Sequence, residues 1–216
     1  MEQTSVNHNT EQTFSRERPL DLAALQQYRN DPSVPLLLTV EYCGGSDAVV
    51  RMYEKQTSAS DTAEAAWNCL LTCPAYVGRD GVGKASEGDM RTPVGDYRLE
   101  YPFGILPDPG CAVPYRQIED HLYWCADRPW YNKLISIRKH PHRCTGEHLI
   151  KYSPQYHYSL FIGYNKAGVF GAGSAIFLHC FGPKQYTGGC VAVSEENMKE
   201  ILLHFRKGTR IVIHNS

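Results

Sequence analysis

The sequence lacks any long apolar run and any excess of charge of one sign. Its 216 residues include 22 Lys and Arg against 23 Asp and Glu, a net charge of −1. This balance gives no electrostatic basis for binding nucleic acid or an anionic membrane. No apolar stretch approaches the roughly 20 residues of a membrane-spanning helix, so we expect no membrane span. Residues 1–19 are polar and show no apolar core of a signal peptide, which leaves the route of export open.

The cysteines are numerous, but they do not have the density of a small disulfide scaffold. The eight are Cys43, Cys69, Cys73, Cys111, Cys125, Cys144, Cys180 and Cys190. If one of them is a nucleophile, at least one of the others stays unpaired within a monomer, which is the oligomeric state we assume. We expect most of them to be buried thiols.

Aromatic and turn-forming residues are abundant instead. The chain contains 14 Tyr, 18 Gly and 13 Pro, which favours a β-rich, loop-rich fold over a helical bundle. The length favours one domain with an appendage. We predict a polar, partly disordered N-terminal segment over residues 1–34, with one short helix at 21–28, and a folded catalytic domain over residues 35–216.

Strand-like patterns recur along the second part of the chain. Residues 35–42 and 48–55 predict a hairpin through the Gly-Gly-Ser-Asp turn between them. Residues 101–155 are rich in proline, and we expect mostly irregular structure carrying a binding surface there. Further strands are predicted at 65–78 with a break at Pro74, and at 96–100, 157–165, 175–180 and 209–214.

The clearest helix is predicted at 194–205. Ser194 is its expected N-cap and Gly208 its stop signal. The apolar residues recur at helical spacing, which predicts one buried face. They are Met198, Ile201, Leu202 and Phe205.

Residues 176–198 contain the strongest candidates for chemistry. His179 ends a buried strand, and Cys190 follows two glycines. Cysteine catalysis needs a thiolate, a proton acceptor and donors for an oxyanion. We predict Cys190 as nucleophile, His179 as general acid and base, and the Gly189 and Cys190 N–H groups as oxyanion donors. Gly188 and Gly189 lack a Cβ, so a substrate can approach the backbone there. No acidic residue nearby in sequence is placed to orient His179, so a backbone carbonyl is the expected partner.

Taken alone, a cysteine and a histidine at this spacing are more often structural than catalytic, so their setting decides. The setting resembles the L,D-transpeptidase catalytic domain, also called the YkuD-type domain. Members carry a His at a strand end and then Ser/Thr-x-Gly-Cys, matched here by His179 and residues 187–190. A Gly-rich segment before a strand matches at 83–99. The branch pattern GSAIFLH…GCVAVSEENM matches at 173–179 and 189–198. Residues 121–135 and 158–165 fit the same branch, and the resemblance covers about residues 36–213.

The resemblance implies a mainly β fold, a β-sandwich or flattened barrel with one or two short packed helices, in the cell envelope. It implies that Cys190 attacks a carbonyl at the L-centre of a diamino acid in a peptidoglycan stem tetrapeptide. The terminal D-Ala leaves, protonated by His179, and a second stem's amine then forms a 3–3 cross-link. Water as acceptor would make the protein an L,D-carboxypeptidase, and an antibacterial hydrolase or a non-catalytic wall-binding module are further alternatives. No cofactor is implied.

The sequence departs from many members in the substrate-facing loop. Gly188 stands where many have a second His, and Ala192 where many have Arg or Asn; the interval from His to Cys is also shorter. These changes leave the acyl-enzyme chemistry in place and leave the acceptor open.

Other residues are weaker candidates. We predict Thr187, Gly188, Arg91 and Tyr158 as substrate-binding residues, with Arg91 suited to a carboxylate; for Arg91 and Tyr158 a structural role is the alternative. One histidine-rich segment suggests zinc, but its spacing lacks the paired hooks of a structural site and there is no HExxH. We therefore expect a solvated loop or a cap over the active site there, and no metal. That segment contains His140, His142, Cys144 and His148.

Overall fold

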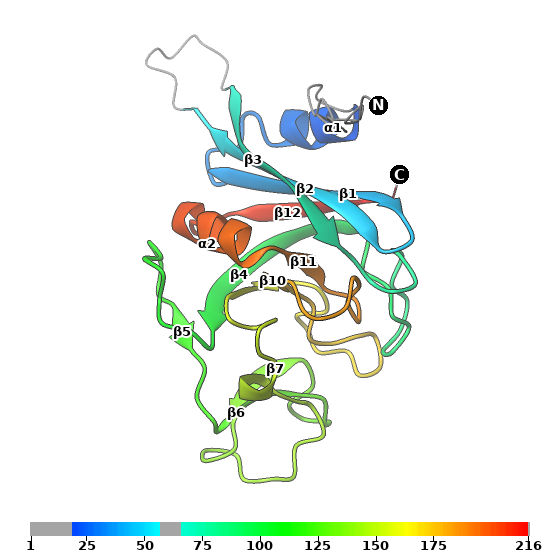
Figure 1. Ribbon diagram of the computed structural model, residues 1–216, viewed down its shortest axis with the longest axis vertical. Helices are drawn as coiled ribbons and strands as arrows, with labels where there is room; N and C mark the ends of the chain where they lie inside the picture. The colour runs from blue at the N-terminus through cyan, green and yellow to red at the C-terminus, as the bar shows by residue number, and fades with distance from the viewer. Residues whose placement is uncertain (1–18, 57–65, 216) are drawn as a thin grey trace, which may run out of the picture.

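The computed structural model describes residues 19–56 and 66–215. Nine strands form one sheet in the order β12-β1-β2-β3-β11-β10-β9-β4-β5, and an added pairing of β12 with β4 closes the sheet into a ring. The predicted mainly β architecture of a flattened barrel or sandwich is confirmed (Figure 1). The strands are β1 (Leu36–Gly44), β2 (Asp47–Lys55), β3 (Trp67–Tyr76), β4 (Gly95–Gly104), β5 (Arg116–Gln117), β9 (Ser159–Ile162), β10 (Phe177–Cys180), β11 (Val191–Val193) and β12 (Arg210–His214).

The predicted first hairpin is confirmed. β1 and β2 pair antiparallel, and Gly45 in the turn has a φ of 60°, a conformation that glycine adopts at little cost. The first part of β1 is buried on both faces. Its outer face is covered by α1 (Pro19–Gln27), the short helix expected at 21–28. Leu25 of α1 and Tyr28 directly after it form a small apolar cluster with Leu37 of β1.

A buried charge network also ties α1 to the barrel. One nitrogen of Arg51 lies 3.0 Å from a carboxylate oxygen of Asp21 and 3.0 Å from one of Glu41. Removing one partner of such a group leaves an uncompensated buried charge, so α1 and the barrel stabilise each other. The disorder expected for the first residues concerns positions outside those described, and the boundary at residue 34 stays a prediction.

The expected break at Pro74 is wrong. β3 runs through this residue, which lies opposite Val49 of β2. Proline removes a hydrogen-bond donor, and a strand tolerates it where that donor is not needed. On its other side β3 pairs with β11 only where Tyr76 meets Ala192, so Pro74 lies beyond that short ladder.

The predicted C-terminal helix is confirmed as α2 (Glu195–His204). The Ser194 hydroxyl accepts the Asn197 N–H at 3.1 Å, as an N-cap does. The apolar stripe is buried, and Gly208 follows the helix with a φ of 97°. The helix packs against β10, one of the strands that carry the candidate site.

Residues 101–155 are more regular than expected. Besides the end of β4 and β5 they contain a separate three-stranded sheet in the order β7-β6-β8, here called the small sheet. Its strands are too short to produce a readable alternation, which is why the sequence pattern missed them. The sheet lies at the end of the molecule opposite α1 (Figure 1). Its elements are β6 (Leu122–Cys125), β7 (Lys133–Ser136) and β8 (Glu147–His148), followed by the 3-10 helix η1 (Leu149–Lys151).

An aromatic cluster joins the small sheet to the barrel. Trp124 of β6 packs against Phe177 of β10 with ring centroids 4.7 Å apart, and Phe103 of β4 lies 5.1 Å from Phe177. Cys190 belongs to the same cluster. The candidate nucleophile therefore lies where the two sheets meet.

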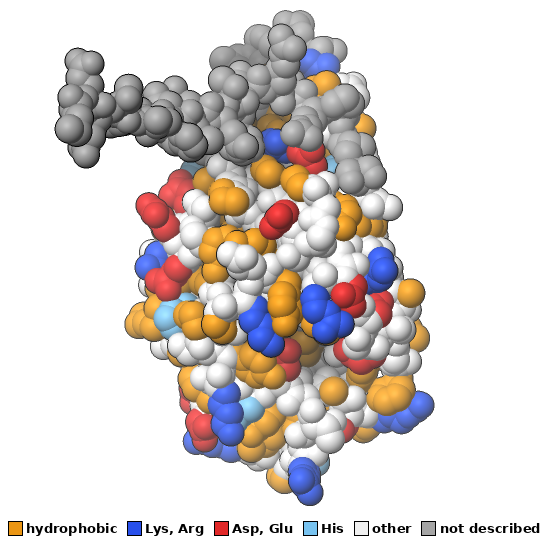
Figure 2. All heavy atoms as spheres, turned by 45° about the vertical axis from the view of Figure 1, so that its right-hand side comes forward, with side chains coloured by type: hydrophobic (Ala, Val, Ile, Leu, Met, Phe, Trp, Pro, Cys, Tyr) orange, Lys and Arg blue, Asp and Glu red, His pale blue; other side chains and the backbone are white. Residues whose placement is uncertain are grey.

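Charges are mixed on the surface. Figure 2 shows Lys and Arg side chains interspersed with Asp and Glu and with apolar groups on the face it displays. No helix among the described residues has the length and apolar character needed to cross a bilayer.

Candidate active site

His179 lies in β10, and Cys190 directly precedes the neighbouring parallel strand β11. In the β10–β11 ladder Leu178 lies opposite Val191 and His179 opposite Ala192. Because side chains alternate along a strand, His179 and Cys190 both project from one face of this pair. Both line one pocket with a volume of about 570 Å³. The fold thus brings the predicted nucleophile and the predicted acid and base to one pocket.

The thiol of Cys190 is held by backbone groups. Its Sγ donates to the Ala175 carbonyl at 3.1 Å and accepts the Phe177 N–H at 3.3 Å. Only 7% of Cys190 is exposed. Burial raises the pKa of the thiol to about 12, and the nearby carboxyl of Glu147 adds to the rise. The group is therefore a neutral thiol at neutral pH.

The imidazole of His179 is oriented by a backbone carbonyl, the kind of partner expected from the sequence. Its Nδ1 donates to the Cys180 carbonyl at 2.7 Å. A carbonyl only accepts, so Nδ1 carries the proton and Nε2 of the neutral ring is a proton acceptor. Burial lowers the pKa of His179 to about 4, against which the Cys180 hydrogen bond acts in the opposite direction. Thiol and imidazole are both uncharged at neutral pH.

Threonine hydroxyls fix the loop that carries Cys190. Thr187 Oγ1 accepts the Gly189 N–H at 3.0 Å and donates to the Cys190 carbonyl at 2.7 Å. Thr92 Oγ1 donates to the same carbonyl at 2.9 Å. Thr187, one of the predicted substrate-binding residues, lines the pocket, but its hydroxyl is engaged within the loop, so its contacts here are structural.

The two glycines of this loop serve different purposes. Gly189 has a φ of 139°, and a Cβ there would lie 2.8 Å from the Arg91 carbonyl oxygen and 3.2 Å from Ile176 Cδ1. The protein's own packing thus fills the space next to Gly189. A Cβ at Gly188 would meet no atom within 4 Å, and Gly188 lines the pocket. The open approach expected at both glycines exists at Gly188.

The two N–H groups expected as oxyanion donors, those of Gly189 and Cys190, differ in whether they already donate a hydrogen bond within the loop. The Gly189 N–H already donates to Thr187, so it can serve an oxyanion only if that hydrogen bond opens. The Cys190 N–H comes from the residue that carries the nucleophile, a position that suits an oxyanion donor. It remains the stronger of the two candidates.

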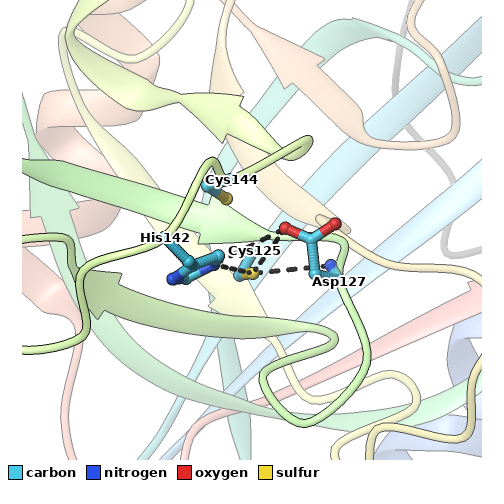
Figure 3. A group of neighbouring side chains, drawn as sticks. All are labelled: Cys125, Asp127, His142 and Cys144. Carbon is cyan, nitrogen blue, oxygen red and sulfur yellow. Dashed lines mark hydrogen bonds and ion pairs between the residues drawn. The ribbon is translucent and has the colours of Figure 1, made fainter.

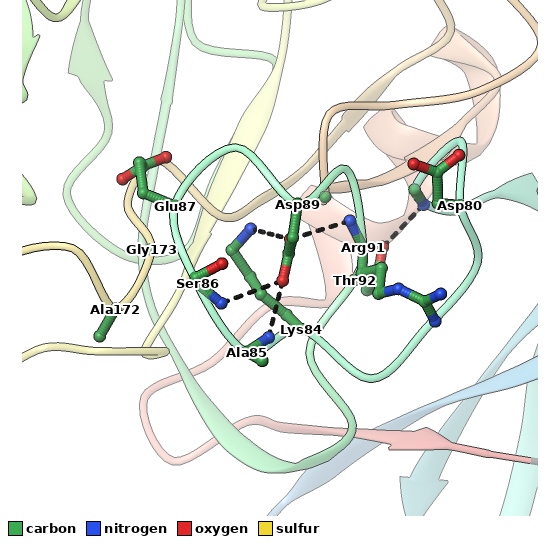
Figure 4. A network of polar contacts seen from close by, with 12 residues as sticks. Asp80, Lys84, Ala85, Ser86, Glu87, Asp89, Arg91, Thr92, Ala172 and Gly173 are labelled. Carbon is green, nitrogen blue, oxygen red and sulfur yellow. Dashed lines mark hydrogen bonds and ion pairs between the residues drawn. The ribbon is translucent and has the colours of Figure 1, made fainter.

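The Gly-rich segment before β4 is held by Asp89, as Figure 4 shows. One carboxylate oxygen accepts Lys84 Nζ at 2.8 Å and the Arg91 N–H at 3.1 Å; the other accepts the N–H groups of Ala85 at 2.7 Å and Ser86 at 3.0 Å. Burial acts to raise the pKa of Asp89, but these hydrogen bonds outweigh it and hold the pKa well below its ordinary value. Asp89 is thus a permanent anion that organises the segment.

Lys84 brings a positive charge to the catalytic loop, a feature that the sequence analysis missed. Its side chain is 1% exposed. A Cβ at Gly189 would lie 3.5 Å from Lys84 Nζ, so the ammonium lies beside the peptide that precedes Cys190. This charge acts to lower the pKa of the Cys190 thiol, in opposition to the larger effect of burial.

Two of the predicted substrate-binding residues do not line the pocket. The Arg91 guanidinium donates to the Val82 carbonyl at 3.0 Å and pins the Gly-rich segment. Tyr158 is buried in the barrel core and lies under Lys199, whose Nζ is 5.3 Å from its ring centroid. Tyr158 directly precedes β9 and points into the barrel, so packing explains it. Both residues follow the structural alternative.

A half-buried acid lies close to Cys190, and no sequence pattern indicated it. Tyr156 donates its hydroxyl proton to Glu147 at 2.6 Å, and both residues line the pocket. Burial raises the pKa of Glu147 to about 7, although the Tyr156 hydrogen bond acts to lower it. Residues 145–147 thus form part of the pocket wall, in agreement with the cap predicted around the histidine-rich segment.

Asn132 positions the backbone that contacts the thiol. Its Oδ1 accepts the Trp124 indole N–H at 2.8 Å and the Ala175 N–H at 3.0 Å, and its Nδ2 donates to two carbonyls in the loop after β9. Asn132 and Ala175 have φ values of 59° and 54°. Because Ala175 accepts the Cys190 thiol proton, this buried amide sets where that acceptor lies.

One group of possible metal ligands gathers among the described residues, beside the pocket. It consists of Cys125, Asp127, His142 and Cys144. The other histidines of the segment go elsewhere: the His140 ring packs on Trp130 at 4.1 Å, and His148 stacks on Tyr123 at 4.3 Å. The sequence had grouped residues that the fold separates.

Comparison with known proteins identifies the family of the chain. A family model described as the L,D-transpeptidase catalytic domain, YkuD, matches residues 67–213. A search of curated proteins found no relative that matches the chain. The matched region runs from β3 to β12 and includes His179 and Cys190 with the loops that hold them. Because the match covers more than half of the chain, the protein belongs to the L,D-transpeptidase catalytic domain family.

Proposed function

We propose that the protein is a peptidoglycan L,D-transpeptidase that works through a thioester on Cys190. The observation that carries the proposal is the placement of His179 on β10 and of Cys190 directly before the adjacent strand β11 at one pocket, with Nε2 of His179 free of a proton. The donor substrate is a stem tetrapeptide, and the product is a 3–3 cross-link. The activity then takes place in the cell envelope, where peptidoglycan lies.

In the first half-reaction the Cys190 thiol proton moves to Nε2 of His179 while Sγ bonds to the carbonyl carbon of the L-centre. The carbonyl electrons move onto oxygen, where the Cys190 N–H donates to the oxyanion. The intermediate then collapses, the C–N bond to D-Ala breaks, and His179 protonates the departing amine. The product of this half is a thioester and free D-Ala.

In the second half-reaction a side-chain amine of another stem attacks the thioester carbon. His179 takes a proton from this amine and returns it to the departing Cys190 sulfur, so the enzyme ends as it began. Gly188 leaves open space next to the nucleophile in which an acceptor can lie. Water in the same place would hydrolyse the thioester, which is the carboxypeptidase alternative.

The electrostatics suit a nucleophile that is activated only with substrate present. Burial disfavours both the thiolate of Cys190 and the imidazolium of His179. It therefore raises the pKa of Cys190 to about 12 and lowers the pKa of His179 to about 4. The thiolate–imidazolium pair is therefore a minor state of the free enzyme. Bond formation to the carbonyl consumes the thiolate as it forms, which removes the need for a stable ion pair.

Purified disaccharide-tetrapeptides test the proposal. The wild-type protein should convert them to a cross-linked dimer with loss of one D-Ala, read by mass spectrometry, and Cys190→Ala should not. Cys111→Ser, a half-buried cysteine away from the pocket, is the matched control. Loss of D-Ala without dimer would replace transfer by hydrolysis. Full turnover by Cys190→Ala, or no thioester in the wild type, would refute thiol catalysis and favour a wall-binding module.

A further inference from the structure

Four side chains with metal-binding atoms converge at one end of the small sheet (Figure 3). Cys125 ends β6 and Asp127 follows it, while His142 and Cys144 lie in the loop that leads into β8. The four ligand atoms, two sulfurs, one imidazole nitrogen and one carboxylate oxygen, all lie within 4.8 Å of one another. We call these residues the four-ligand group.

The separations within the group fit a tetrahedral metal site. Zinc bonds of about 2.3 Å to sulfur and about 2.0–2.2 Å to nitrogen and oxygen place tetrahedral ligands about 3.4–3.8 Å apart. Cys125 Sγ lies 3.4 Å from His142 Nε2 and 3.6 Å from Asp127 Oδ2. His142 Nε2 lies 3.5 Å from Asp127 Oδ2. These three ligand atoms are thus already at coordination spacing, and Cys144 Sγ lies within 4.8 Å of each of them.

Backbone and hydroxyl groups orient the ligands from outside the group. His142 Nδ1 donates to the His140 carbonyl at 2.7 Å, which leaves Nε2 as the metal-binding nitrogen. Thr145 donates its hydroxyl proton to Asp127 Oδ1 at 2.6 Å, on the side away from His142. Such outer partners fix ring and carboxylate orientation in metal sites.

Each sulfur also accepts a backbone N–H from the residue two positions later. The Asp127 N–H lies 3.4 Å from Cys125 Sγ, and the Gly146 N–H lies 3.4 Å from Cys144 Sγ. N–H donors of this kind stabilise a metal-bound thiolate more than a neutral thiol. The two hooks, Cys-x-Asp and His-x-Cys, are therefore built alike around their sulfurs.

We propose that the four-ligand group binds one Zn²⁺ ion as a closed, four-coordinate structural site. Two soft thiolates with an imidazole and a carboxylate favour zinc over oxygen-preferring calcium or magnesium. Four protein ligands leave no open position for catalysis. A Cys125–Cys144 disulfide is the competing chemistry, but it would use only the sulfurs and leave the orientation of His142 and Asp127 without a purpose.

The ion would clamp the wall of the pocket. Ala126 lies between the ligands of the first hook, and Thr145, Gly146 and Glu147 follow the second; all four line the pocket. The metal would hold the loop before β8 against the end of β6 and so fix Glu147 beside Cys190. This inference does not depend on the proposed reaction, because its test measures metal.

Metal analysis of the full chain tests the site. The protein is produced with zinc in the medium, without a histidine tag, and purified without chelators; elemental mass spectrometry should find about one zinc per chain. Cys144→Ser and His142→Asn should each lower the zinc content at least several-fold. Cys111→Ser is the matched control and should keep the zinc content of the wild type. Cys111 also has an aspartate close by, because its N–H lies 2.8 Å from Asp108 Oδ1, but it lies outside the four-ligand group.

Cobalt substitution provides a second readout if a variant folds poorly. Reduced, metal-free wild-type protein given Co²⁺ should show thiolate-to-cobalt charge-transfer and tetrahedral ligand-field absorption, and zinc should abolish both. Zinc should also raise the unfolding temperature of the wild type and not that of His142→Asn. Wild-type protein with no zinc and no cobalt spectrum would overturn the site. A mass lower by two hydrogens, with Cys125 and Cys144 linked in peptide maps, would assign the disulfide instead.

Discussion

One wall of the pocket, here called the strand wall, is made of main-sheet strands joined by backbone ladders. Another wall, here called the loop wall, is made of loops and the short strand β8, which pairs with β6 and is held to the barrel by side chains. The first, β10 and β11, carries His179 and Cys190 and is buried along its length. The second, from the small sheet to η1, carries Glu147 and depends on polar contacts such as those of Asn132. Ladder hydrogen bonds set the reacting atoms with little freedom. Loops held by side chains can change shape between relatives without disturbing those atoms.

The largest expected effect is a loss of activity when a residue of the strand wall is changed. His179→Gln removes the proton acceptor, and we expect kcat/KM for dimer formation to fall by about 10³-fold or more with the fold retained. In the wild type the low pKa, about 4, keeps Nε2 available down to that pH, so activity lost to His179 protonation should appear only as pH falls toward it. A pH–rate profile and circular dichroism measure these effects. A histidine-dependent limb near pH 6.5, the ordinary value, would contradict the burial argument.

The next effect comes from the loop wall. The pKa of Glu147 rises from 4.5 to about 7 on folding, so the folded chain holds this proton more tightly than the unfolded chain. The stabilisation that this proton provides is fully present below the pKa of the unfolded chain, 4.5. It is lost as pH rises through the pKa of the folded chain, about 7. Between about pH 4 and pH 8, Glu147→Gln should gain on the order of 3 kcal/mol relative to wild type.

Urea denaturation at several pH values measures this difference. Glu196→Gln, a change at an exposed carboxyl of α2, is the control and should give a constant difference. If the difference in unfolding free energy between Glu147→Gln and wild type is also independent of pH, the Glu147 carboxyl is solvated. The two walls would then not differ in their electrostatics.

A smaller effect separates the two glycines of the strand wall. Gly189→Ala places a Cβ 2.8 Å from the Arg91 carbonyl at a φ of 139°. We expect a loss of about 2 kcal/mol of unfolding free energy. Gly188→Ala meets open space and should change stability by under about 0.5 kcal/mol. Chemical denaturation of both variants gives the comparison; equal losses would mean that the loop relaxes around the new methyl group.

The smallest effect is expected at Tyr158. Its ring lies in the barrel core and not in the pocket. Tyr158→Phe should therefore leave kcat and KM for the tetrapeptide within about twofold of wild type. A selective rise in KM would restore the substrate contact that the sequence suggested.

Much of the barrel was predictable because its signals are local. The β1–β2 hairpin follows from a turn and two apolar runs, and α2 from its Ser194 cap and apolar stripe. The prediction of a strand break at Pro74 was wrong because the cost of a proline depends on whether a neighbouring strand needs the missing N–H donor. The small sheet was missed because strands of two to four residues leave no periodicity to read.

The position of the candidate pair at one pocket was predictable, and its surroundings were not. His179 and Cys190 stand in one segment with a recognisable pattern. Asn132, Glu147 and Lys84 act on them from distant segments, and no spacing rule connects these residues to the site. Arg91 and Tyr158 were chosen for their side-chain chemistry, but their contacts depend on the direction of the backbone that carries them.

The sequence by itself determined the barrel's main elements, the family and the candidate pair Cys190 and His179, because each depends on residues close together in the chain. Only the tertiary structure decided the charge states in the pocket, since burial by remote segments sets the pKa values of Cys190, His179 and Glu147. It also decided which residues form the four-ligand group. Metal ligands must meet within a few ångströms, and the fold, not the spacing, brings Cys125 and Asp127 to His142 and Cys144.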